Sequence, residues 1–475
     1  MDNDNCLLNY FFIIGTTDET RQQIIEENMK IKDISISPKI LSSYSIDGET
    51  QLFSFIKDAL NKKNDDLRNN IFPMKTDYLD VLQNKSNIEQ YLEIKNVYSD
   101  YIIETEKDCA PEHSYHCFQY EFELENGHDL ILNFGVLLFF ENVYSNRLQE
   151  NDNIDKDMNI YLGKALVLVS NKSIFSLMKK ILEKIYVDFV KVKYSFIYLE
   201  PLIVNLFGSL NKKNPKIIIE NKKNIINYYP SNESIMPFCD LNIAYFLELF
   251  DINDILLIAE YYFLTKSIII ISPHYELLYP IYHVLMTFFF PLNYHHRNYF
   301  FKLFYPPCLL GLVSGFPCFF FIYSDKNKDN GYINEDYLQL ITEEMQDILV
   351  FQIVKEYDKE TNKIKINIEK NIYLSDKDKK ISKVPIKVHK DNTLIENAIK
   401  NEKNKFIYIM TINSQIRNIR NALKAVENNT PNEEEVEKLS YIDSNFFDFA
   451  LDLKIYDLLR KNLLGLIIKF IVAKI

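Results

Sequence analysis

The segment from Ile243 to Tyr323 constrains the fold of this chain more than any other segment. It predicts an apolar helix over Ile243 to Leu264 and then a strand over Ile268 to Ile271. This strand is a run of isoleucines, so both of its faces are apolar, which is typical of a buried strand in a parallel sheet. A second apolar helix over Tyr275 to Phe290 leads, past a proline-bounded break, to a strand over Cys318 to Tyr323. This alternation of helix and strand predicts an α/β layer domain.

The composition indicates a folded protein with more than one domain. The chain has 475 residues, of which 47% are hydrophobic and 14% aromatic, and this apolar content is ample for packed cores. The formal net charge of −12 argues against a nucleic-acid-binding protein, because such proteins need a basic face. We therefore expect no nucleic acid among the partners.

Cysteine usage and the hydrophobic runs predict a cytoplasmic protein. The six cysteines are sparse and lack the spacing of a disulfide framework. The amino terminus begins with acidic residues, whereas a signal peptide begins with basic ones. No apolar run reaches the roughly 18 residues that a membrane-spanning helix needs. We expect no transmembrane segment.

Residues 5–190 are expected to form a first α/β lobe. Two alternating runs, Cys117 to Leu124 and Ile131 to Phe140, flank Asn126-Gly127, a dipeptide that tolerates the positive φ of tight hairpin turns. They predict a β-hairpin. The other expected elements are a strand at Leu7 to Ile14, a helix at Gln51 to Leu60, a strand at Tyr161 to Ser170 and a helix at Ile174 to Val190.

The remaining chain is expected to form two further parts. Residues 194–335 would be a second, three-layer α/β lobe, beginning with a segment at Phe196 to Leu210 that is helical towards its end. Residues 336–475 would be mainly α-helical. The expected elements of this last part are helices at Tyr337 to Val354, Ile419 to Val426 and Phe446 to Ile475, and a short strand at Ile372 to Leu374.

Few residues point to chemistry. Cys109, His113, His116 and Cys117 are zinc-type ligands, but their spacing is irregular and they adjoin the hairpin, so we expect no metal. The sequence has no phosphate-binding P-loop, no G-x-G-x-x-G and no G-x-S-x-G motif. No catalytic residues, and no metal or organic cofactor, are therefore expected.

The order of the apolar patterns resembles the DENN domain, with its upstream, central and downstream parts. The stretches that carry the resemblance are Tyr10 to Gly15, Pro38 to Tyr44, Phe72-Pro73, Phe118 to Phe134, Lys164 to Ser170, Ile258-Ala259, Lys266, Ile268 to Ser272, Tyr279 to Pro291 and Tyr373 to Ile381. The chain departs from the family pattern at three places. Thr265 stands where the family has a glutamate, Tyr294 stands near the position of its tryptophan, and only Pro306-Pro307 remains of its proline-rich stretch.

The resemblance implies a function in vesicle trafficking. A DENN module of this kind has a longin-like amino-terminal lobe, binds the nucleotide-free or GDP form of a Rab-type small GTPase through both α/β lobes, and promotes release of GDP. It reaches vesicle or organelle membranes peripherally, through the GTPase. Tyr294, His295 and Arg297 are the expected contacts, because aromatic and arginine side chains are enriched at binding hot spots.

Two alternatives stay open at this point. A folliculin-like GTPase-activating relative would supply an arginine finger, for which Arg147 is the candidate. A scaffold subunit of a trafficking complex would have neither activity.

Overall fold

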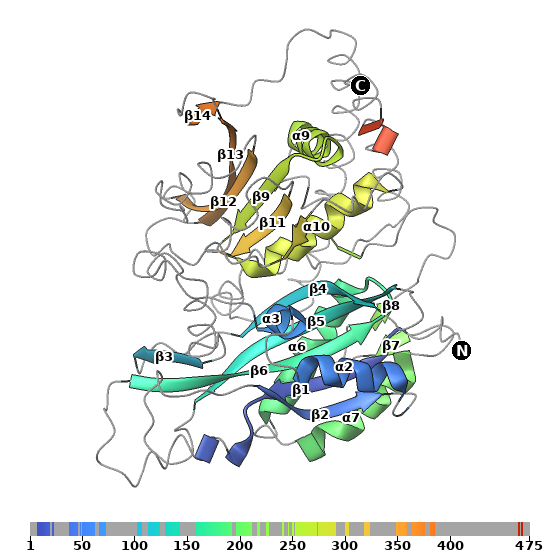
Figure 1. Ribbon diagram of the computed structural model, residues 1–475. Coiled ribbons are helices and arrows are strands. Elements are labelled where there is room, and N and C mark those ends of the chain that lie inside the picture. Colours follow the sequence, from blue (N-terminus) through green and yellow to red (C-terminus); the bar gives the residue numbers. More distant parts are fainter. Residues whose placement is uncertain are drawn as a thin grey trace, which may run out of the picture. The chain divides into compact units, whose positions relative to one another are not determined.

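The computed structural model is drawn in Figure 1, and the chain divides into two compact units, unit 1 (residues 1–232) and unit 2 (residues 233–475). Each unit is described by itself. The residues that the structure describes are 7–19, 21–22, 38–45, 48, 50–61, 66–72, 102–106, 113–123, 129–142, 158–191, 196–210, 216–218, 225–227, 240–241, 246, 249–250, 252–272, 274–290, 300–303, 318–323, 348–358, 363–375, 381–384, 464–465 and 467–468.

Unit 1 is built on a six-stranded antiparallel sheet (Figure 1). Five strands follow the order β2-β1-β6-β5-β4, and β3 pairs with the first half of β6, beside the stretch that pairs with β1. The strands are β1 (Tyr10–Gly15), β2 (Lys39–Ser45), β3 (Ile102–Glu106), β4 (Ser114–Glu123), β5 (Asp129–Asn142) and β6 (Met158–Ser170). The antiparallel pair β4 and β5 confirms the predicted hairpin, and its turn lies outside the described residues.

Helices cover both faces of this sheet. On one face Phe53 of α2 (Gln51–Asn61) stacks on Tyr10 and Phe12 of β1, with ring centroids 5.2 and 5.5 Å apart. On the other face Phe139 of β5 contacts Tyr186 and Phe189 of α6 (Phe175–Lys191). The two sets lie on opposite faces because Phe12 and Val136 both pair with Val167, and successive strand residues alternate in direction. The remaining elements of unit 1 are α3 (Asp66–Ile71), α7 (Phe196–Leu210), and the small pair β7 (Lys216–Ile218) and β8 (Ile225–Asn227).

Gly135 sets how closely α6 approaches the sheet. A Cβ atom at Gly135 would lie 2.8 Å from Met178 Cβ and 2.8 Å from the Tyr115 hydroxyl. That hydroxyl donates a hydrogen bond of 2.9 Å to the Phe175 carbonyl, at the start of α6. The glycine therefore lets one helix lie directly on β5, where any other residue would displace it.

Unit 2 contains a second six-stranded sheet, ordered β10-β11-β9-β12-β13-β14. Strands β10, β11, β9 and β12 are parallel, and β13 and β14 extend the sheet in antiparallel fashion. The strands are β9 (Ser267–Ser272), β10 (Phe300–Lys302), β11 (Cys318–Tyr323), β12 (Ile348–Asp358), β13 (Lys363–Ser375) and β14 (Ile381–Val384). Strands β9 and β11 confirm the two strands predicted over Ile268 to Ile271 and Cys318 to Tyr323, and they pair in one sheet.

Two apolar helices pack on one face of the parallel strands. They are α9 (Ile252–Phe263) and α10 (Tyr275–Phe289). Tyr282 of α10 contacts Phe319 and Phe321 of β11, with centroids 6.1 and 5.7 Å apart. Phe320 lies between Phe319 and Phe321 and points to the other face of the sheet. It is buried as well, as expected for a strand of a parallel sheet. The described residues thus have a mixed α/β architecture, with a six-stranded antiparallel sheet in unit 1 and a six-stranded, largely parallel sheet in unit 2.

The predicted helix over Tyr337 to Val354 is wrong where the structure describes it. Residues 348–354 belong to β12, which pairs in parallel with β9. The stretch is rich in β-branched residues, which favour strands. Its pairing with β9 and its burial stabilise the strand, although the local apolar pattern also fits a helix. The predicted strand at Ile372 to Leu374 is part of the longer β13. Most of residues 385–475 lie outside the described residues, so the mainly helical tail stays a prediction.

Two helix boundaries also differ from expectation. The helix expected over Ile243 to Leu264 is interrupted: Phe246 and Leu249 are helical, and after a bend α9 begins at Ile252, where Asp254 in its first turn favours a helix start. Phe250, just before it, lies at a bend. The segment from Phe196, expected to be helical only towards its end, is helical throughout as α7. The three domain boundaries predicted from the sequence stay predictions.

Among the described residues, no helix combines the length and the apolar character that crossing a membrane requires.

Candidate functional site

The contact residues predicted from the sequence fall between two described elements of unit 2. Tyr294, His295 and Arg297 are outside the described residues, between the end of α10 at Phe289 and the start of β10 at Phe300. Because β10 runs parallel to β11 and β9, the connection between α10 and β10 enters the sheet at the amino ends of the strands.

Four parallel strands, β10, β11, β9 and β12, begin side by side at this amino edge. Phe300 of β10 pairs with Cys318 of β11, and the register of β11 against β9 places Cys318 level with Ser267. Neighbouring strands are about 4.8 Å apart, so the start of β10 is roughly 10 Å from the start of β9. The turn before β9 is therefore the described segment that lies beside the end of the predicted contact connection.

That turn, Leu264 to Lys266, ends α9 in a strained conformation. Thr265 has φ of +53°, in the left-handed region that glycine usually occupies. The Lys266 amide donates to the Tyr261 carbonyl at 2.8 Å, and the Thr265 amide donates to the Tyr262 carbonyl at 3.2 Å. These two bonds form a Schellman cap, which satisfies carbonyls at the end of the helix. A β-branched residue in this conformation costs about 1 kcal/mol or more, so the fold holds the turn against a local preference.

The turn presents an apolar and a cationic side chain next to each other. Leu264 is 48% exposed. The Lys266 ammonium lies 5.2 Å from the centroid of the Tyr261 ring, a cation–π contact that fixes its position. An exposed leucine beside an oriented lysine can contact a protein surface that offers an apolar pocket and a carboxylate. Such a pair has no means of covalent catalysis.

The Cys318 side chain is buried at this edge of the sheet and is chemically unreactive. Burial raises the pKa of its thiol to about 12, and a hydrogen bond with the Ser267 side chain opposes that rise in part. The thiol is fully buried and forms no disulfide. It therefore stays protonated at neutral pH, where a nucleophilic cysteine would need to be a thiolate.

At the opposite, carboxyl edge, the polar groups of β9 serve the fold. The Ser272 hydroxyl donates to the His274 carbonyl at 3.0 Å and accepts from the His274 amide at 2.9 Å. These bonds close the turn between β9 and α10. Ligands of open α/β sheets commonly bind at this edge, but here the serine is engaged by the turn itself.

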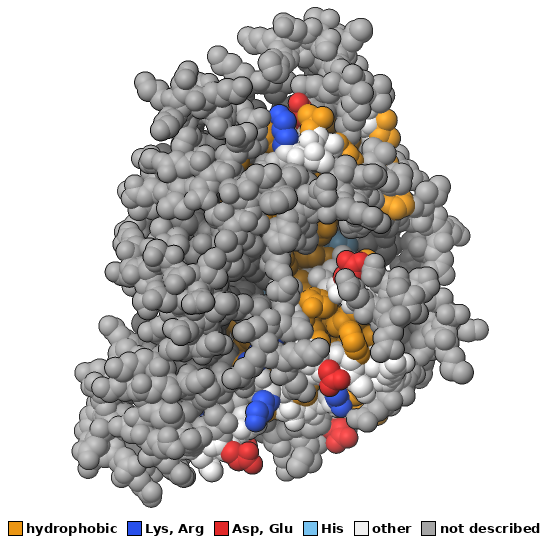
Figure 2. All heavy atoms as spheres, in the orientation of Figure 1, with side chains coloured by type: hydrophobic (Ala, Val, Ile, Leu, Met, Phe, Trp, Pro, Cys, Tyr) orange, Lys and Arg blue, Asp and Glu red, His pale blue; other side chains and the backbone are white. Residues whose placement is uncertain are grey.

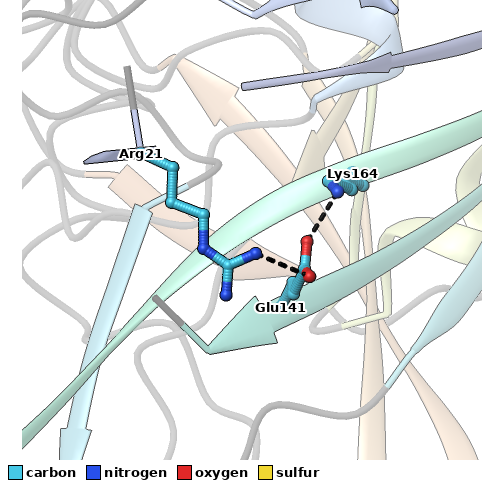
Figure 3. Close-up of polar contacts among 3 residues, drawn as sticks. All are labelled: Arg21, Glu141 and Lys164. Carbon is cyan, nitrogen blue, oxygen red and sulfur yellow. Dashed lines mark hydrogen bonds and ion pairs between the residues drawn. The ribbon is translucent and has the colours of Figure 1, made fainter. Parts of the chain in front are cut away.

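Unit 1 holds a partly buried ion cluster that the sequence did not predict (Figure 3). The Glu141 carboxylate lies between two cations, with one oxygen 2.8 Å from Arg21 Nη1 and the other 2.6 Å from Lys164 Nζ. Glu141 lies on β5, Lys164 on β6, and Arg21 in a helical turn after β1. Gly15 makes room for the cluster, because a Cβ atom there would lie 2.8 Å from Lys164 Cγ.

The cluster fastens the segment after β1 to the sheet. All three side chains are only 11–14% exposed, so the charges are held in fixed positions. Arg21 is therefore committed to Glu141 and is not placed as a finger that could reach a nucleotide. Arg147, the predicted finger, lies outside the described residues.

The cysteine and histidine residues near the hairpin have separate surroundings. His116 and Cys117 are adjacent in β4, so their side chains point to opposite faces of the sheet. The His116 Nε2 atom lies 2.8 Å from the Asn70 carbonyl, and His113 packs on the ring of Tyr186. Cys109 is outside the described residues. Within the described parts of the chain, no three potential metal ligands converge.

The surface charges of unit 1 are mixed. On the face drawn in Figure 2, the acidic and basic side chains of its described residues are interspersed.

Comparison with protein families gives one match. Residues 161–321 match the model of the DENN (AEX-3) domain, which supports a DENN-domain protein. The matched range runs from β6 to β11 and includes the turn at Leu264 to Lys266. Comparison with curated proteins gives no match. DENN domains generally bind small GTPases, so the match is consistent with a GTPase-regulating role.

Proposed function

We propose that this chain is a guanine nucleotide exchange factor that promotes GDP release from a Rab-family small GTPase in vesicle trafficking. The observation that carries the proposal is the DENN match over residues 161–321. The DENN-like order of patterns upstream and downstream of that range supports a three-part module. In the described residues no competing catalytic cluster offers another role.

The mechanism requires differential affinity and no covalent step. An exchange factor accelerates GDP release when it binds the nucleotide-free GTPase more tightly than the loaded form. Cellular GTP then replaces the lost GDP. The residues of this chain need only bind the switch segments of the GTPase and hold them in a conformation that has low affinity for nucleotide.

The amino edge of the parallel sheet is the proposed contact surface. The proposed contacts are Leu264 and Lys266, together with Tyr294, His295 and Arg297, which precede β10 in the sequence. Support comes from the exposed leucine, the oriented lysine and the strained turn that holds them, because strain of this kind is often retained at functional sites.

The test is release of a fluorescent GDP analogue from a panel of purified Rab proteins, with GTP hydrolysis measured in parallel. We expect at least one Rab to release GDP faster with the full chain, and no acceleration of hydrolysis. Leu264→Asp and Arg297→Ala should each slow that release at least about tenfold, the effect of losing a typical hot-spot contact. Val187→Asp, at a position equally exposed on α6, is the matched control and should leave the rate unchanged.

Faster hydrolysis without faster release would instead indicate a GTPase-activating protein. If no Rab in the panel shows faster GDP release or faster hydrolysis, both activities are ruled out and a scaffold role remains.

A further inference from the structure

Within the described residues, strand β2 is the last strand on one side of the sheet in unit 1. It pairs with β1 on one side, in the register from Tyr10 opposite Ser45 to Gly15 opposite Lys39. Among the described residues no strand pairs with its other side, and Figure 1 shows β2 as the outermost strand. A β-strand edge of this kind presents backbone amides and carbonyls that can pair with a further strand.

The side chains of β2 do little to block such pairing. The strand reads Lys-Ile-Leu-Ser-Ser-Tyr-Ser, with its one charge at the first residue, Lys39. Ser42, Ser43 and Ser45 are too small to shield the backbone. The register shift beside Ile13 leaves Leu41 as an extra, bulged residue, and β2 is a regular strand from Ser42 onward.

Two exposed apolar side chains, on β2 and on α7, accompany this edge on the face of the sheet that α6 covers. Tyr44 contacts Phe207 of α7, with ring centroids 5.1 Å apart, so α7 flanks β2. Val204 of the same helix is 42% exposed. Leu41 is 37% exposed, and its Cδ1 lies 3.4 Å from the Cβ position of Gly15, which places Leu41 on that same face. Leu41 and Val204 are therefore exposed apolar side chains, one on β2 and one on the helix that flanks it.

We propose that an extended peptide segment of a partner protein adds to β2 as a further strand, with an apolar side chain against Leu41 and Val204. Backbone hydrogen bonds would supply the affinity, and the side chains on the Leu41 face would supply the specificity. The proposal does not depend on nucleotide exchange.

Size and charge favour a peptide over a second copy of this chain. Seven strand residues span about 24 Å, and a sheet is about 10 Å thick, so the edge offers on the order of 240 Å². Each partner in a stable protein interface buries about 800 Å². The net charge of −12 also opposes self-association and favours a segment with basic residues.

The probe is a labelled peptide of alternating valine and threonine between two lysines, N-methylated at every second amide. These methyl groups leave one edge able to pair and prevent the peptide from stacking on itself. The control peptide is methylated at every amide and has no pairing edge. Fluorescence anisotropy with the full chain should give a dissociation constant below about 1 mM for the probe and no binding of the control.

Variants locate the binding. Leu41→Asp and Val204→Asp should each weaken binding of the probe at least about fivefold, because a charge replaces the apolar contact. Val187→Asp, on the same face of the sheet but on α6, should change it less than about twofold. All three positions are exposed, so melting temperatures should stay near that of the wild type.

Three results would overturn the proposal. These are no binding of the probe, equal binding of both peptides, or binding that neither Leu41→Asp nor Val204→Asp weakens. Sedimentation of the wild type is the remaining check, because a dimer that Leu41→Asp disperses would assign the edge to a second copy instead.

Discussion

At the scale of single residues, Thr265 holds a conformation that its side chain disfavours. The sequence did not reveal this, because threonine gives no signal for a positive φ, whereas glycine or asparagine would. Only the hydrogen bonds of the cap show that the turn needs a left-handed residue.

Replacing Thr265 with glycine should relieve the strain. We expect Thr265→Gly to raise the free energy of unfolding by about 1 kcal/mol, as measured by denaturant unfolding. Thr265→Ala, which keeps a Cβ atom, is the control and should change stability by less than about 0.5 kcal/mol. A loss of stability in the glycine variant would show that the threonine side chain makes a contact outweighing the strain.

Cys318 gives a prediction for alkaline pH. Its thiol has a pKa of about 12 in the folded chain because of burial, against about 9 when exposed. Between these values the unfolded chain loses the proton first, so stability is full below pH 9 and falls as the pH rises towards 12. Denaturant unfolding should show a steeper loss of stability over this range for the wild type than for Cys318→Val. Equal slopes would show that the thiol is not desolvated as described.

At the scale of elements, the sequence predicted those strands and helices whose signals are local. The hairpin of β4 and β5 carries alternation and an Asn-Gly turn, and β9 carries its run of isoleucines. Strand β12 was predicted as a helix because its identity depends on pairing with β9, about 80 residues earlier in the chain. A local sequence pattern does not show which distant strand a segment will pair with.

The ion cluster could not be predicted from the sequence either, because it also depends on long-range contacts. Arg21 and Glu141 are separated by 120 residues in sequence. Each residue alone is an ordinary surface charge by sequence criteria. Only the sheet, by placing β1, β5 and β6 side by side, brings them together with Lys164 (Figure 3).

Glu141 should therefore matter for the stability of unit 1. Glu141→Gln would leave two largely buried cations without their carboxylate, and we expect the free energy of unfolding to fall by about 2–4 kcal/mol. The control is Asp188→Asn, which breaks an i,i+4 pair with Lys184 on α6 whose side chains are 21% and 27% exposed. That loss should be below about 0.5 kcal/mol. Equal effects in the two variants, measured by denaturant unfolding, would show that the cluster adds nothing beyond a surface ion pair.

At the scale of the whole molecule, the central claim is that this chain favours a GTPase that has lost its nucleotide. The DENN match and the mixed α/β architecture support that claim, while the contact residues come from the resemblance and from the geometry of one sheet edge. Any exchange factor must show unequal affinities, whichever residues make the contact, because binding and nucleotide release are thermodynamically linked.

The most direct measurement is the affinity of the full chain for the nucleotide-free, GDP-loaded and GTP-loaded forms of each Rab in the panel. We expect the nucleotide-free form of the responsive Rab to bind at least about tenfold more tightly than either loaded form. Equal affinity for all three forms, across the whole panel, would contradict the proposed exchange activity, because a protein that does not distinguish these forms cannot promote GDP release.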